Sequence, residues 1–185
     1  VTIFMEYMKN GSLSDLLSKS KKEIVKNYDN TAKQIILIGI ARAMMYLHKH
    51  NIIHRDLKPG NVLLDDNLYP HVTDFGVSKI IQNKSTASQS YALGTLAYTA
   101  PEIFTGDKCN SKVDVYSFGI LMFEVITGSD PYPDLESGKI SCFVFPSKIF
   151  RDNCRPTFKD PIKNSIKKLI EKCWSKDPKN RPTFE

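Results

Sequence analysis

The stretch HRDLKPGNVLLD, at residues 54–65, crowds six polar side chains against an apolar run, and Asp74 follows thirteen residues after Asn61. Magnesium prefers carboxylate and amide oxygens as ligands. A phosphoryl group in transfer also needs a nearby cation and a group that accepts the proton of the attacking hydroxyl. Groups suited to these tasks are present on Asp56, Lys58, Asn61 and Asp74. A single Asp or Asn in a loop is usually a turn former, but this combination favours phosphoryl transfer from a magnesium-bound nucleotide.

Composition narrows the class of protein without naming its activity. The 185 residues suit one domain or one large lobe, and 41% hydrophobic with 25% charged residues is typical of a globular protein. The net charge of +6 fits a phosphate-bearing ligand or an acidic partner, but no basic block interleaved with aromatics points to nucleic acid. The four cysteines form no CxxC pair, which favours reduced thiols in the cytosol. No apolar run is long enough for a membrane span, and no signal peptide is expected.

The first third of the chain is expected to position the polar stretch. Residues 1–8 read as a strand entered midway through a sheet, and Ser12 with Asp15 forms a candidate capping box for a short helix. A polar, exposed connection is expected at 18–29. Apolar residues then recur at helical spacing over 31–50 on more than one face, so we predict a buried helix there.

The later elements are predicted from the same kind of pattern. Short β-like pieces, NIIH, NVLLD and HVTDFG, flank the polar stretch, and the Ser/Thr-rich residues 79–90 are typical of a mobile loop. A largely apolar helix is expected at 111–127, closed by Gly128, and an amphipathic helix at 162–174. A further helix is expected to begin at the final RPTFE. The fold class is therefore mostly α with minor β.

The motifs HRDLKPGN, DFG and YTAPE, in this order and spacing, resemble the catalytic loop and activation segment of eukaryotic protein kinases. The resemblance covers nearly the whole chain. It implies a partial protein kinase domain over 1–185, with the hinge strand at 1–8 and the C-terminal lobe at 9–185. On this interpretation the N-lobe is nearly absent, and the C-lobe is truncated at its last helix.

The resemblance implies a role for each polar residue of the two loops. Asp56 is similar to the catalytic aspartate that orients the substrate hydroxyl and accepts its proton, and Lys58 to the lysine that contacts the γ-phosphate of ATP. Asn61 and Asp74 resemble the ligands of Mg²⁺. The implied cofactors are therefore ATP and Mg²⁺.

An adenine site is implied by MEYMKNGSL, which resembles the hinge of the family. Met5 would be the gatekeeper, and the backbones of Glu6 and Met8 would bond the adenine edge. Asp15 would lie near the ribose, and Leu63 would form the apolar floor beneath adenine.

Regulatory and structural roles follow from the same resemblance. Arg55 resembles the arginine that receives an activation-loop phosphate from an upstream kinase; candidate phosphoacceptors are Ser85, Thr86, Ser88 and Ser90. Asp114 resembles the buried aspartate that anchors the catalytic loop, and Glu102 with Arg181 resembles a structural ion pair. The expectation for His54 is packing, and His48 carries no signal.

The substrate class is indicated by two residues. Lys58 stands two residues after the catalytic aspartate, and Thr95 stands where serine/threonine kinases keep a threonine near that aspartate. Other stretches, such as DVYSFGILMFEVITG, resemble tyrosine kinases. The mixture is similar to the tyrosine-kinase-like group of serine/threonine kinases.

Two functions remain open on the sequence. One is a serine/threonine kinase with ATP and protein substrates, present as a fragment without its N-lobe; the other is a non-catalytic kinase-like module that binds or regulates partners. The four intact residues of the two loops favour the kinase for the parent protein, whereas the missing N-lobe favours the non-catalytic module for this chain alone. Little or no activity is therefore expected of the isolated chain. Phosphate transfer to a basic protein would discriminate the two. A cytoplasmic location is expected, either alone or as the cytoplasmic part of a longer membrane protein.

Overall fold

The described residues of the computed structural model are 6–21, 28–74, 79–80, 93–106 and 109–185. Their long helices are α1 (Leu13–Lys21), α2 (Asn30–Lys49), α5 (Lys112–Thr127) and α8 (Asn164–Cys173). Shorter helices are α3 (Leu93–Leu96), α4 (Pro101–Thr105), α6 (Pro133–Glu136) and α7 (Phe145–Phe150), with 3-10 turns η1 (Pro59–Asn61) and η3 (Pro178–Asn180). This confirms a mostly helical fold.

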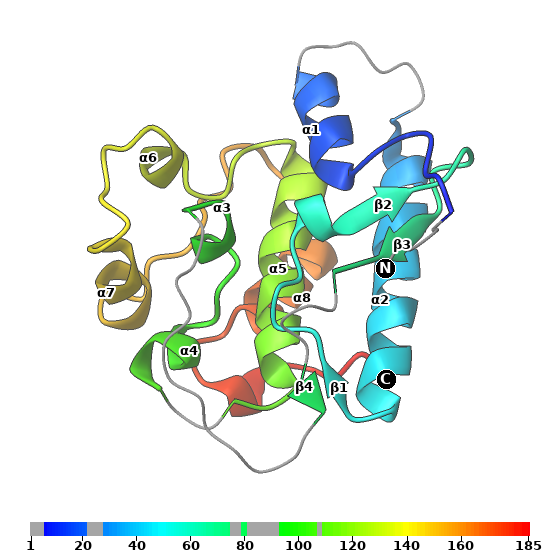
Figure 1. The fold of residues 1–185 in the computed structure, drawn as a ribbon. Helices are drawn as coiled ribbons and strands as arrows, with labels where there is room; N and C mark the ends of the chain where they lie inside the picture. Colours follow the sequence, from blue (N-terminus) through cyan, green and yellow to red (C-terminus); the bar gives the residue numbers. More distant parts are fainter. Residues whose placement is uncertain (1–5, 22–27, 75–78, 81–92, 107–108) are drawn as a thin grey trace, which may run out of the picture.

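Helix α5 forms the centre of the molecule, with α2 on one side and α6 and α7 on the other (Figure 1). Every residue from Val113 to Val125 is buried, because apolar side chains occur on all faces of this helix. Its close contact with α8 requires a glycine: a Cβ at Gly119 would lie 2.8 Å from Cβ of Cys173. Gly128 ends the helix in the left-handed conformation, at φ 68°. The predicted helix at 111–127 is confirmed.

Helix α2 differs from its prediction. Its buried residues, spaced three or four apart, form a single stripe (Ala32, Ile36, Ile40, Met44 and Leu47). Ile38 and Tyr46 on the outer side are 53% and 62% exposed. The expectation of burial on more than one face was therefore wrong, because a high apolar content does not by itself supply a second packing partner.

Two antiparallel strand pairs hold the loops that carry the polar residues. β2 (Val62–Leu64) pairs with β3 (Pro70–Val72), and β1 (Ile52–Ile53) pairs with β4 (Lys79–Ile80). The expected short strands are confirmed, while Lys79 and Ile80 are strand rather than loop. Residues 81–90 of the predicted mobile loop lie outside the described residues.

The two ends of the chain also depart from expectation where they are described. Residues 6–8 carry no regular secondary structure, and 1–5 of the predicted hinge strand lie outside the described residues. Residues 181–185 form no helix. No helix in the described ranges is both long and apolar enough to cross a membrane.

Candidate active site

The polar loop, residues 54–61, follows β1, ends in η1 and leads directly into β2. Its backbone is strained at one point, because Arg55 has φ 70°, in the left-handed region that non-glycine residues avoid. Asp74, on the neighbouring loop after β3, has φ 63°. Such conformations persist only where the surroundings impose them.

A buried carboxylate fixes the start of this loop. Asp114, on α5, is fully buried, and its Oδ2 and Oδ1 accept the backbone N–H groups of His54 at 2.9 Å and Arg55 at 2.8 Å. Nε2 of His48, from α2, lies 2.8 Å from Oδ2 of the same carboxylate. The predicted anchoring by Asp114 is therefore present in the structure, and His48, to which the sequence analysis assigned no signal, takes part in it.

His54 joins the two loops. Its fully buried ring donates from Nε2 to the carbonyl of Thr73 at 2.9 Å, and its Nδ1 accepts the N–H of Asp56 at 3.3 Å. The packing expected for His54 is correct, but the ring also connects the residue before Asp74 to Asp56. The sequence offered no signal for this second role.

Asp56, Lys58, Asn61 and Thr95 form one hydrogen-bonded cluster. The ammonium of Lys58 lies 2.8 Å from Oδ2 of Asp56 and 2.8 Å from Oγ1 of Thr95. The amide nitrogen of Asn61 donates to the carbonyl of Asp56 at 2.8 Å and to its Oδ2 at 2.9 Å. Oδ1 of Asp56 is buried and has no hydrogen-bond partner among the described residues. One carboxylate oxygen is thus held by two side chains, while the other has no described partner.

Asn61 and the segment before Asp74 are joined through their backbones. The N–H of Thr73 donates to the carbonyl of Asn61 at 2.9 Å, and the Thr73 hydroxyl reaches the same oxygen at 3.3 Å. Because the Asn61 amide nitrogen is engaged with Asp56, its amide oxygen points the other way. An amide oxygen and the exposed carboxylate of Asp74, on adjoining segments, suit the ligand preference of Mg²⁺.

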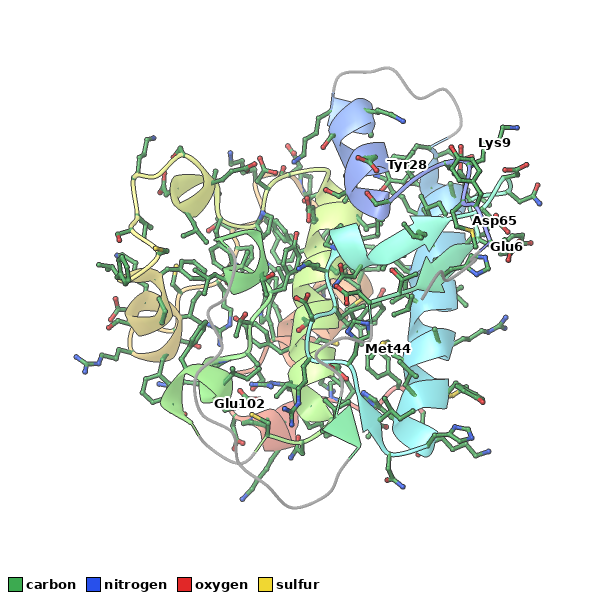
Figure 2. All side chains as sticks on the ribbon, in the orientation of Figure 1. Glu6, Lys9, Tyr28, Met44, Asp65 and Glu102 are labelled. Atoms are coloured by element: carbon green, nitrogen blue, oxygen red, sulfur yellow. The ribbon has the colours of Figure 1, made fainter. Side chains whose placement is uncertain are left out.

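The predicted adenine floor lies on the outer face of β2. Val62 and Leu64 are fully buried, whereas Leu63 between them is half-buried and faces the opposite way. Leu64 donates its N–H to the carbonyl of Gly11 at 2.9 Å, so the strand is fastened to the segment that follows Met8. In Figure 2, Glu6 and Asp65 are labelled on the same side of the view as β2 and β3. Met8 is half-buried, and Met5 lies outside the described residues.

Asp15 is engaged in a helix cap. Its Oδ2 accepts the N–H and the hydroxyl of Ser12, at 2.9 and 2.6 Å, and its own N–H donates to the Ser12 hydroxyl at 3.1 Å. These bonds, the side-chain bond first, lower the pKa of Asp15. The predicted capping box is confirmed; a ribose contact stays a prediction.

A cavity of about 370 Å³ opens beside Lys58 and Thr95. It is lined between α1, α5 and α6 by acidic residues that include Glu124, Asp130 and Glu136. Burial raises the pKa of Glu124, which accepts a hydrogen bond from the Tyr98 hydroxyl at 2.5 Å. Lys21 of α1 forms ion pairs with Glu124 and Asp130. The cavity lining therefore contains three carboxylates and two lysines, Lys21 and Lys58, next to the polar cluster.

The remaining predicted residues lie around this centre. Arg181 binds Glu102 in a buried, two-point ion pair, with N–O distances of 2.6 and 2.8 Å, as expected. Arg55 is half-buried, and its Nε has no hydrogen-bond partner in the described part of the chain. The candidate phosphoacceptors Ser85, Thr86, Ser88 and Ser90 lie outside the described residues.

Comparison with known proteins finds one family and many relatives. The protein kinase domain matches residues 1–185. A probable serine/threonine-protein kinase of Dictyostelium discoideum is 36% identical over 188 residues, covering 99% of this chain and 13% of that protein. Serine/threonine-protein kinase 12 of Arabidopsis thaliana is 39% identical over 188 residues, 98% of this chain and 39% of that protein. A putative serine/threonine-protein kinase/receptor of Acanthamoeba polyphaga mimivirus is 35% identical over 186 residues. The chain therefore spans well under half of these relatives.

Proposed function

This chain belongs to the protein kinase family, and from that premise we propose that it transfers the γ-phosphate of ATP to serine or threonine hydroxyls of proteins. The observation that carries the proposal is the polar cluster. Asp56 holds one carboxylate oxygen in bonds to Lys58 and Asn61 and keeps the other, buried oxygen without a partner among the described residues.

Asp56 is the proposed proton acceptor. Its Oδ1 accepts the proton of the substrate hydroxyl as the oxygen–phosphorus bond forms. The bond from the γ-phosphorus to the β–γ bridging oxygen breaks, and ADP leaves with that electron pair. A positioned base of this kind is worth about 10²- to 10⁴-fold in rate. The bonds from Lys58 and Asn61 to Oδ2 support this role, because they fix the orientation of the carboxylate before substrate binds.

Lys58 and Thr95 are proposed to shape the γ-phosphate and substrate side of the site. The Lys58 ammonium bridges Asp56 and Thr95, so it is held where negative charge would develop on the transferred group. Thr95 is 9% exposed, and its bond to Lys58 supports the sequence-based assignment to the serine/threonine class.

Asn61 and Asp74 are the proposed holders of Mg²⁺, which would neutralise phosphate charge when bound. The chemistry of the donors supports this, since one is an amide oxygen and the other a carboxylate. The nucleotide would lie along the face of β2 that carries Leu63, with the backbones of Glu6 and Met8 at the adenine edge and Asp15 near the ribose. The half-buried, outward position of Leu63 supports this placement.

The cavity beside Lys58 is the proposed position for part of the protein substrate. Its three carboxylates outnumber its two lysines, which favours a substrate segment that carries lysine or arginine. A phosphate on the activation segment would pair with Arg55, whose buried Nε has no described partner, and an upstream kinase would supply it.

The test is transfer of labelled phosphate from ATP and Mg²⁺ to a basic protein, followed by identification of the labelled amino acids. Phosphoserine and phosphothreonine are expected, and Asp74→Asn should abolish the transfer. Asp66→Asn, a change at an exposed aspartate outside the site, is the matched control and should retain it. Label found only on tyrosine, or equal transfer by wild type and Asp74→Asn, would contradict the proposal. No transfer by any form would favour the non-catalytic interpretation.

A further inference from the structure

The positive charge of this chain is concentrated in its last quarter. Residues 139–185 contain twelve lysines and arginines against five acidic residues, whereas residues 1–138 contain 14 against 15. The net charge of +6 therefore comes entirely from the segment that forms α7, α8 and their connections. Nothing in the proposed phosphoryl transfer requires this imbalance, since the nucleotide site lies on residues before 100.

Large apolar side chains are exposed within this basic segment. Phe143 and Val144, which lead into α7, are 90% and 50% exposed, and Phe150 at its end is 38% exposed. No acidic residue occurs between Glu136 and Asp152. Phe143 has the highest exposed fraction of the large apolar residues that the structure describes, and three such residues lie close together in sequence here.

One cation contacts these apolar groups, and two more belong to α7 or follow it directly in the chain. Phe145 and Ile149 are buried and fix α7 on the core, whereas Phe150 is exposed and Lys148 is half-buried. Lys148 lies one helical turn from Val144, with its N–H 3.3 Å from the Val144 carbonyl, and the Arg151 N–H donates to Ser147 at 2.7 Å. The ammonium of Lys176, beyond α8, lies 5.2 Å from the centre of the Phe150 ring. We call this surface the α7 face: Phe143, Val144, Lys148, Phe150, Arg151 and Lys176.

The cations of the α7 face are available to a partner. No carboxylate lies within ion-pair distance of Lys148, Arg151 or Lys176 in the part of the chain that the structure describes; the neighbouring ion pairs involve other lysines. In Figure 1, α7 lies at the edge of the molecule opposite β2 and β3. A partner on the α7 face would therefore leave the proposed nucleotide site accessible.

We propose that the α7 face rests on an anionic lipid surface, with Phe143 and Val144 entering the headgroup boundary and the cations lying against the lipid charges. Protein surfaces that lie on membranes typically carry exposed apolar side chains beside lysine and arginine. Their binding strength depends on the apolar area that becomes buried and on attraction to anionic lipid. The form of the surface favours lipid over an acidic protein. Phe143 projects almost completely, and a fluid headgroup layer accepts such a ring without a matching pocket.

The test is sedimentation of the 185-residue chain with vesicles of phosphatidylcholine, with and without 30% phosphatidylserine. We expect binding only to the anionic vesicles, weakening as the salt concentration rises, because the Debye length shortens. Each cation near an anionic surface contributes about 1 kcal/mol, or roughly fivefold, so Lys148→Gln with Arg151→Gln should lower the partition coefficient about 25-fold. Phe143→Asp should lower it at least about tenfold, since burial of a phenyl group is worth about 1.5–3 kcal/mol.

Matched controls come from α2, on another surface. Lys49→Gln and Ile38→Asp change an exposed cation and an exposed apolar residue outside the α7 face, and both should bind like wild type. Equal binding to neutral vesicles, equal loss in the α2 and α7 variants, or no binding at low salt would each overturn the proposal. Binding of soluble polyglutamate without binding of vesicles would also overturn it and assign the face to an acidic protein. Phosphate transfer plays no part in this readout, so the two proposals fail independently.

Discussion

Two regions near the polar loop differ in how completely their polar groups are bonded. We call the region of Asp114, Glu102 and Arg181 the core side, and the region of the polar cluster around Asp56 the cleft side. On the core side, the Asp114 carboxylate accepts bonds from two backbone N–H groups and contacts His48, and the Glu102–Arg181 pair is bonded at both oxygens. On the cleft side, Asp56 has one engaged oxygen and one without a described partner. Both sides contain charged residues, and in this comparison the carboxylate oxygen without a described partner lies on the cleft side.

This difference separates the residues that position the polar loop from the residue that is proposed to take part in the reaction. A buried charge whose two oxygens are both bonded positions the chain, and removing one of its partners is strongly destabilising. A buried oxygen without a partner costs stability, and at Asp56 we attribute its retention to the proposed bond with the substrate hydroxyl. The comparison therefore predicts that core-side variants lose mainly stability and cleft-side variants lose mainly activity.

The largest loss of stability is expected for Asp114→Asn. The amide can accept from only one of the two backbone N–H groups of His54 and Arg55, and its own NH₂ group faces the other donor. We expect the free energy of unfolding to fall by about 4 kcal/mol, since hydrogen bonds to a buried charge are worth about 1.5–3 kcal/mol each. Urea denaturation measures the free energy of unfolding. A loss below about 1 kcal/mol would contradict the role of Asp114 in anchoring the polar loop.

A slightly smaller loss is expected for Arg181→Ala. The change leaves the Glu102 carboxylate buried without its guanidinium partner, which should cost about 3 kcal/mol. The double variant Glu102→Gln with Arg181→Met should recover part of this loss, because it removes both charges. A double variant less stable than Arg181→Ala in the same denaturation experiment would show that the pair is not the cause.

Thr95→Val tests a buried residue that bonds the polar cluster through its hydroxyl. The valine has a similar shape but cannot bond Lys58, so we expect kcat to fall about tenfold, equivalent to one hydrogen bond of about 1.4 kcal/mol, with little change in stability. Thr95→Ser keeps the hydroxyl and should restore most of the rate. Steady-state kinetics would contradict the assignment if the serine and valine variants were equally slow.

The smallest effect is expected at the helix cap, which belongs to neither side. Asp15→Asn weakens the capping bonds to Ser12 and should cost about 0.5–1 kcal/mol. Because the folded state lowers the Asp15 pKa below its usual value of 3.8, the contribution is present above pH 3.8 and is lost as the pH falls through the folded pKa. Thermal unfolding from pH 7 to pH 2.5 should therefore bring the variant and wild type together at low pH.

Much of the helical fold and of the bonded core side could be predicted from the sequence. The apolar helix at 111–127 and the Ser12–Asp15 cap are local patterns, and Asp114, Glu102 and Arg181 were recognised by motif. His48 was missed because a single histidine has no sequence pattern, and its contact with Asp114 spans 66 residues. The second role of His54 was missed for the same reason.

Other errors have a packing origin. The apolar outer residues of α2, such as Ile38, gave a false signal of burial, since sequence shows side-chain type but not whether a neighbouring element exists. The pairing of β4 with β1 was also missed, because Lys79 and Ile80 begin a polar, Ser/Thr-rich stretch. Long-range strand pairing of two residues leaves no periodic pattern to detect.

The central claim is that Asp56 acts in chemistry rather than in folding. Its most direct test is Asp56→Asn, with phosphate transfer and the free energy of unfolding measured on the same preparation and Asp66→Asn as control. We predict that transfer falls about 10³-fold while the unfolding free energy stays within about 1 kcal/mol of wild type. Transfer equal to wild type, or a loss of transfer explained entirely by unfolding of the variant, would contradict the claim.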